Sequence, residues 1–148
     1  MQSFDSMPRG AAVWLALAVG SVLLLQGCGA QPGPQAPQPR LFSSDFQGAA
    51  KSCTVPKPSL AAGKETAAAM TVANDGGWCA ISVADDGKPY ASGLLTELPA
   101  HGEVYIHPVG NMTRIDYTPD VGFAGSDAFA VRLLPGNPVL RVSVTVRR

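Results

Sequence analysis

The amino-acid sequence predicts an all-β domain at residues 51–148, and three observations lead to that prediction. Turn signals recur about every eight to fifteen residues, a spacing typical of β-sandwiches and barrels. No long stretch repeats its apolar residues with the period of about 3.6 that an amphipathic helix needs. At the C-terminus, Leu140, Val142, Val144 and Val146 alternate with polar residues, as expected of a half-buried strand. We therefore expect an antiparallel β-sandwich.

Other strands are indicated by short apolar or alternating runs that end at turn residues. In the run EVYIH, Val104 and Ile106 share a face. In the run TRIDY, Arg114 and Asp116 point to the face opposite Ile115. The predicted strands before the C-terminal one are 70–73, 78–83, 103–107, 113–117 and 128–133.

Turn residues separate these runs, and one segment has two interpretations. Asp85-Asp86-Gly87 predicts a hairpin, because Asp and Gly tolerate the positive φ that a tight turn requires. The cluster at 108–111 is expected to end the strand before it, since it begins with Pro. The segment at 64–70 (KETAAAM) contains strong helix formers, so it is either a short helix or an Ala-rich strand in a tight core.

The N-terminus has the pattern of an export signal. Residues 11–25 carry no charge, and this length suits the apolar core of a signal peptide better than a bilayer-spanning helix, which needs about 20 residues. The four residues at the end of this run, Leu25-Gln26-Gly27-Cys28, of which Leu25 is the last apolar residue, resemble the lipobox of bacterial lipoproteins, although Gln26 replaces the small residue common at its position. The alternatives are an ordinary signal peptide cut nearby, which would leave Cys28 as a free thiol, and an uncleaved anchor.

The lipobox resemblance implies that Cys28 receives a thioether-linked diacylglycerol and becomes the first residue of the mature chain. Gly29 follows, where inner-membrane retention signals have Asp, so the resemblance favours the outer membrane. The segment 31–39 (QPGPQAPQP) then predicts a semi-rigid polyproline spacer of roughly 30 Å. A Pro-rich ligand for a peptide-binding module is the other interpretation. The division is a signal peptide at 1–27, a lipidated tether at 28–50 and a β-domain at 51–148.

The cysteine count agrees with an exported protein. If Cys28 carries lipid, Cys53 and Cys79 remain as a pair that an oxidising periplasm would allow to form a disulfide. Such a bond would close a loop of about 26 residues and contribute roughly 3 kcal/mol in the chain-entropy model. The alternative is two buried free thiols.

A thirteen-residue segment from Tyr117 to Phe129 resembles the Y-x-P-x-x-G-F-x-G-x-D-x-F signature of bacterial Ig-like and cadherin-like surface domains. The resemblance implies an Ig-like sandwich. Each fixed position has a structural use: a strand end, special backbone angles, core filling and acceptance of turn N–H groups. The fixed positions are Tyr117, Pro119, Gly122, Phe123, Gly125, Asp127 and Phe129.

Composition and motifs point away from several functions. Eleven Lys and Arg balance eleven Asp and Glu, so the basic surface that nucleic-acid binding requires is missing. No catalytic motif is recognisable, and His101 and His107 have the pattern of surface residues, so we expect no enzyme, no cofactor and no metal. The carboxylates that would serve a calcium site fall mainly in turns, where Asp has a local role. They are Asp75, Asp85, Asp86, Asp116, Asp120 and Asp127.

These observations favour a non-enzymatic, membrane-anchored envelope lipoprotein that binds a protein or a glycan. The alternative is a small periplasmic enzyme or a calcium-dependent binding domain that uses the turn carboxylates. Convergence of the acidic loops in space would favour the alternative.

Overall fold

The computed structural model describes residues 40–148. The predicted signal peptide, the lipobox with Cys28 and the Pro-rich segment 31–39 lie outside these residues. The described part is all-β and consists of two sheets, as the turn spacing predicted. The elements are the 3-10 turn η1 (Ser43–Phe46) and the strands β1 (Cys53–Thr54), β2 (Glu65–Ala73), β3 (Cys79–Val83), β4 (Ser92–Glu97), β5 (Gly102–Val109), β6 (Met112–Pro119), β7 (Gly125–Leu134) and β8 (Val139–Arg147).

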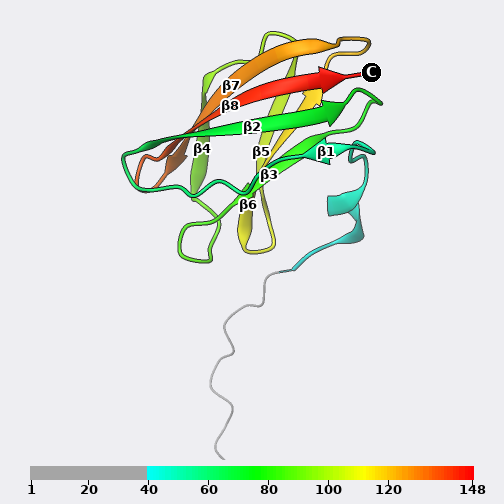
Figure 1. The fold of residues 1–148 in the computed structure, drawn as a ribbon. Helices are drawn as coiled ribbons and strands as arrows, with labels where there is room; N and C mark the ends of the chain where they lie inside the picture. Colours follow the sequence, from blue (N-terminus) through cyan, green and yellow to red (C-terminus); the bar gives the residue numbers. More distant parts are fainter. Residues whose placement is uncertain (1–39) are drawn as a thin grey trace, which may run out of the picture. The chain divides into compact units, whose positions relative to one another are not determined.

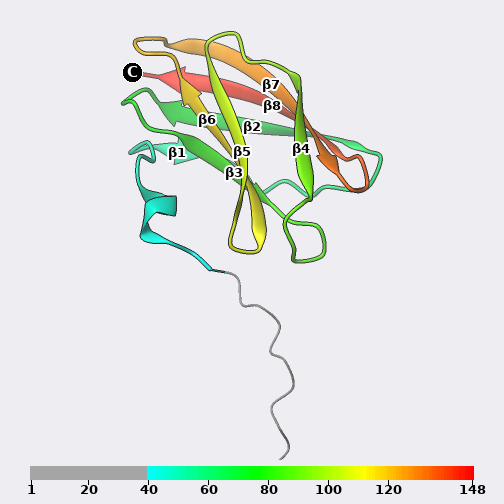
Figure 2. The same ribbon diagram turned by 180° about the vertical axis from the view of Figure 1, so that it is seen from behind.

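The larger sheet has the strand order β1-β2-β8-β7-β4, and the smaller sheet has the order β3-β6-β5 (Figure 1). Every pairing is antiparallel except that of β2 with β8, which runs parallel over the whole length of β2. Seen from behind, the smaller sheet lies in front of the larger one (Figure 2). Strands from both ends of the domain therefore lie side by side in its larger sheet.

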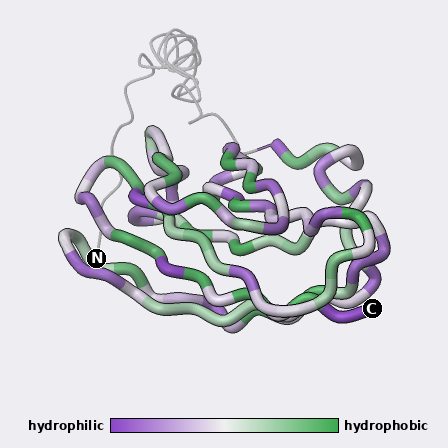
Figure 3. The backbone as a smooth tube through the Cα atoms, turned by 90° about the horizontal axis from the view of Figure 1, so that it is seen from above, coloured by the Kyte–Doolittle hydropathy of each residue, from purple (hydrophilic) through white to green (hydrophobic). Residues whose placement is uncertain are grey.

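The core fills the space between the sheets and follows the alternation of the strands. Leu140, Val142 and Val144 on β8 are buried, while the residues between them are exposed. Tyr117 and Phe129 are the largest fully buried side chains. Hydrophobic and hydrophilic residues alternate along much of the chain in Figure 3, as expected for strands with one buried face.

The segment with two interpretations forms a strand. Residues 64–70 provide most of β2, in which Ala68, Met70 and Val72 turn toward the core and the residues between them turn away. Pairing with β8 supplies nine in-register partners, and this contact overrides the helix propensity of the alanines.

Two turn predictions require correction. The turn at Asp85–Lys88 forms, with positive φ at Asp86 and Gly87, but the flanking strands β3 and β4 separate into different sheets and do not make a hairpin. Pro108 does not end its strand, because β5 continues to Val109. A proline is tolerated there because β5 is an edge strand.

Candidate functional site

A disulfide joins Cys53 of β1 to Cys79 of β3. The predicted pairing is therefore present, and the alternative of two free thiols is wrong. The two strands belong to different sheets, so the bond connects the larger sheet to the smaller one beside the core. Cys28, the predicted lipidation site, lies outside the described residues.

The Tyr117–Phe129 segment organises a polar centre beneath the loop between β4 and β5. The Asp127 carboxylate accepts hydrogen bonds from the backbone N–H groups of Ala100 (2.9 Å), His101 (3.0 Å) and Ala128 (2.9 Å). It also accepts one from the Tyr117 hydroxyl at 2.8 Å. This one buried side chain therefore ties β7 to β6 and to the start of β5.

The protonation of both groups follows from these contacts. Burial raises the pKa of Tyr117, and its hydrogen bond to the Asp127 carboxylate raises it further. Burial also acts to raise the pKa of Asp127, but the N–H groups and the Tyr117 hydroxyl outweigh it and hold the pKa below its ordinary value. The pair is thus a neutral phenol and an ionised carboxylate, which stabilise the fold and are not poised for proton transfer.

The other signature positions also have structural roles. Gly122 and Gly125 have φ of +78° and +150°, where a side chain would strain the backbone. Phe123 stacks on the His101 ring, with centroids 4.1 Å apart. Pro119 is the last residue of β6, and Phe129 is fully buried in the core. The fixed positions of the signature therefore build the corner between β6 and β7.

A charged cluster lies on the outer face of the smaller sheet and is the candidate functional site. Arg114 Nη2 donates to Asp116 Oδ2 at 3.0 Å, and His107 Nε2 lies 3.0 Å from the same oxygen. Arg114 Nε lies 2.9 Å from Asp116 Oδ1, yet this buried oxygen accepts no hydrogen bond, because Nε is directed at Oδ2. The side chains of Arg114 and Asp116 are only 9% and 8% exposed, whereas that of His107 is 20% exposed.

The chain before β1 covers this cluster. The Arg114 guanidinium lies 4.2 Å from the centre of the Trp78 ring and donates to the carbonyl of Asp45 in η1. Trp78 Nε1 donates to the Gln47 carbonyl at 2.9 Å. Hydrogen bonds to backbone carbonyls therefore help to hold this segment on the sheet, and Ala50 packs against the core. Leu41, Phe42 and Phe46 in this segment are 59–63% exposed.

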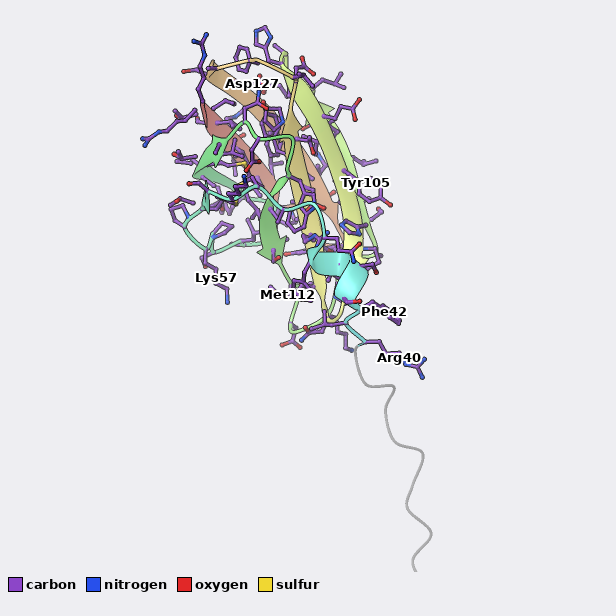
Figure 4. All side chains as sticks on the ribbon, turned by 90° about the vertical axis from the view of Figure 1, so that its right-hand side faces the viewer. Arg40, Phe42, Lys57, Tyr105, Met112 and Asp127 are labelled. Atoms are coloured by element: carbon purple, nitrogen blue, oxygen red, sulfur yellow. A yellow bond between two sulfur atoms is a disulfide. The ribbon has the colours of Figure 1, made fainter. Side chains whose placement is uncertain are left out.

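The open part of the cluster is an aromatic surface. The Tyr105 ring lies 4.6 Å from the His107 ring, and Tyr105 is 65% exposed at the edge of the body (Figure 4). In the described residues, the side-chain hydrogen-bond partner of His107 is the Asp116 carboxylate.

The turn carboxylates do not converge. Within residues 40–148, no group of three or more His, Cys, Asp or Glu side chains is placed to hold a metal ion. Asp75 accepts from the N–H groups of Lys51 and Gly77, and the Lys51 contact holds the pKa of Asp75 below its usual value. Asp116 and Asp127 belong to the two clusters described above. Asp85 and Asp120 use backbone atoms in their turns.

Sequence reasoning placed Arg114 and Asp116 on the correct face of β6 but gave no sign that they are buried. The covering segment lies 69 residues earlier in the chain, so no local pattern reports it. Reasoning from sequence also missed Asn74, whose side-chain amide donates to the carbonyls of Asp120 and Phe123 and holds the signature loop.

Comparisons with known proteins identify no family for this chain. A scan against protein-family models returns no match, and a search of the curated proteins returns none either. Among the described residues, no helix has the length and apolarity to cross a bilayer.

Proposed function

We propose that this protein is a lipid-anchored envelope lipoprotein whose β-domain binds another envelope component without catalysing a reaction. The membrane holds the N-terminal Cys28, and residues 29–39 place the domain within reach of the surface. The charge balance does not fit a basic nucleic-acid interface, because eleven cations balance eleven anions.

The observation that carries the proposal is that two of the three cysteines form a disulfide. Cys53 and Cys79 are joined, and disulfides persist in oxidising compartments outside the cytosol. This pairing leaves Cys28 as the odd cysteine, and it is the one that ends the lipobox-like Leu25–Cys28 sequence after an apolar run. Thioether lipidation accounts both for the position of Cys28 and for the odd number of cysteines in the chain.

We further propose that the domain is Ig-like. If β2 to β8 are taken as strands A to G, the pairings C-F-G and B-E-D of an Ig sandwich are reproduced. Strand A pairs with G in parallel, and the disulfide joins β1 to strand B instead of B to F. The Tyr117–Phe129 signature supports the same assignment, since its residues form the corner between strands E and F.

Metabolic labelling with an alkyne analogue of palmitate tests the anchor. In a bacterial host, the wild-type protein should incorporate the label, and Cys28→Ser should not. The matched control is the double variant Cys53→Ala/Cys79→Ala, which keeps the lipobox and should remain labelled. Label retained in Cys28→Ser, or missing from the wild type, would contradict the proposal.

A further inference from the structure

A groove runs along β3, which is one edge of the smaller sheet. It consists of two adjoining hollows of about 290 and 260 Å³, and Lys57, Pro58, Ser82 and Met112 line both. Lys57 and Met112 lie toward the end of the body where Arg40 is found, and Asp127 lies toward the opposite end (Figure 4). The groove is thus distinct from the signature corner.

The unpaired backbone of β3 points toward the side on which this groove lies. Trp78 donates its N–H to the Gly48 carbonyl and accepts from the Ala50 N–H, both at 2.9 Å, so its backbone groups turn away from β6. Backbone groups of an antiparallel strand alternate between its two edges. Those of Ala80 and Ser82 therefore turn the same way as those of Trp78. Within residues 40–148, no other segment hydrogen bonds to them.

The pairing of β6 with β5 leads independently to the same assignment of the free backbone groups of β3. The Asp120 N–H donates to the His101 carbonyl at 3.0 Å, just beyond the β5–β6 ladder. From Asp120 back along β6, every second residue directs its backbone groups to β5. Ile115 is not one of these residues, so its backbone groups face β3. Ile115 lies opposite Ile81, so the residues on either side of Ile81 carry the free backbone groups.

The neighbouring segment does not pair with this edge. Residues 55–60 flank the groove, but within residues 40–148 no backbone hydrogen bond joins them to β3. Another segment of the chain already pairs with this edge just before β3, because Ala49 makes a parallel bridge to Trp78. That pairing stops at Trp78 and leaves the rest of β3 unpaired on this side.

We propose that an extended segment of another envelope protein binds here, adds to β3 as a further strand and places an acidic side chain at Lys57. This rests on the proposed function of the domain as a binding module. Peptide backbone is the chemistry that satisfies alternating N–H and C=O groups along a strand, and pockets beside the strand select its side chains. Lys57 forms no ion pair within the described residues, so its charge is available to the incoming strand.

The first test measures whether the edge is free. Amide hydrogen exchange of the purified protein, followed residue by residue by NMR, should be fast at Ala80 and Ser82. It should be slow at Cys79, Ile81 and Val83, which bond to β6. Slow exchange at Ala80 and Ser82 in the monomer would overturn the inference, because the edge would already be paired.

The second test uses a photo-crosslinking residue, p-benzoylphenylalanine, at Ser59, which lines the same hollow as Lys57, in the lipidated protein in host membranes. It should yield an adduct in which an extended, acidic segment of another protein maps to position 59, with no such adduct from the same residue at Ser143 on the outer face of β8. Ser82→Pro deletes the outward N–H and should lower the yield about tenfold, whereas Ser82→Ala should stay within about twofold. Circular dichroism checks that both variants fold.

Met112→Glu provides a second variant, because it puts a negative charge in the groove without altering the backbone, and it should lower the yield by a similar factor. An adduct with a second copy of this chain, an adduct with lipid alone, or a yield equal in Ser82→Pro and Ser82→Ala would overturn the inference. Membrane fractionation of each sample shows whether the protein is anchored. A wild-type protein that is not in the membrane fraction would refute the proposed function, whereas the crosslinking results above test the strand addition.

Discussion

Replacement of Asp127 by Ala should destabilise the domain by removing the acceptor of four hydrogen bonds. Each such bond contributes about 1 kcal/mol net, and the Tyr117 hydroxyl keeps its second partner, the His101 carbonyl at 3.1 Å. The loop N–H groups regain some water in the variant. We therefore expect a loss of about 2–3 kcal/mol at pH 7, which is about 10–20 °C in Tm for a domain of this size.

The effect should depend on pH with a defined sign. The folded-state pKa of Asp127 is depressed, so its stabilisation is fully present above the unfolded pKa of about 3.9 and is lost as the pH falls through the folded pKa. Urea unfolding followed by Trp78 fluorescence at pH 7 and at pH 3 or below measures this. Asp127→Ala should cost distinctly less at the lower pH.

Asp120→Ala is the matched control, because Asp120 is an exposed acidic residue in the same corner and only its backbone atoms hydrogen bond in the described residues. It should leave the free energy of unfolding nearly unchanged. A cost below about 1 kcal/mol for Asp127→Ala, or a cost that does not change with pH, would refute the reasoning.

Three further variants should lose different amounts of stability. Cys53→Ala/Cys79→Ala should lower the free energy of unfolding by about 3 kcal/mol, since it opens a loop of 26 residues, and equal urea midpoints for the variant and the wild type would contradict this. Gly102→Ala should cost about 1–3 kcal/mol, because its Cβ would lie 2.6 Å from the Thr118 carbonyl oxygen, and calorimetry giving an unchanged Tm would disprove the clash. Arg141→Ala should leave Tm unchanged although it removes two ion pairs, since both are exposed to solvent, and a marked drop would show that they matter more than their exposure implies.

The parts of the fold that local patterns encode were predictable. Period-two alternation placed Leu140, Val142 and Val144 in the core, and the cysteine count identified the Cys53–Cys79 pair. Asp127 was expected to accept turn N–H groups, and it does.

What depends on distant parts of the chain was not predictable. The segment 64–70 becomes a strand because β8 lies beside it, and β8 is formed about 75 residues later. The burial of Arg114 and Asp116 depends on a covering segment that includes Asp45 and precedes the predicted domain start at residue 51. The turn at Asp85–Lys88 has the local geometry of a hairpin, but the strands on either side of it, β3 and β4, belong to different sheets.

The mass of the mature protein, measured intact after detergent extraction from a bacterial host, tests the central claim most directly. We expect a chain that begins at Cys28 and carries a diacylglyceryl group, with a further mass decrease of two hydrogens for the Cys53–Cys79 bond. A chain that begins elsewhere, or one whose Cys28 is unmodified, would contradict it.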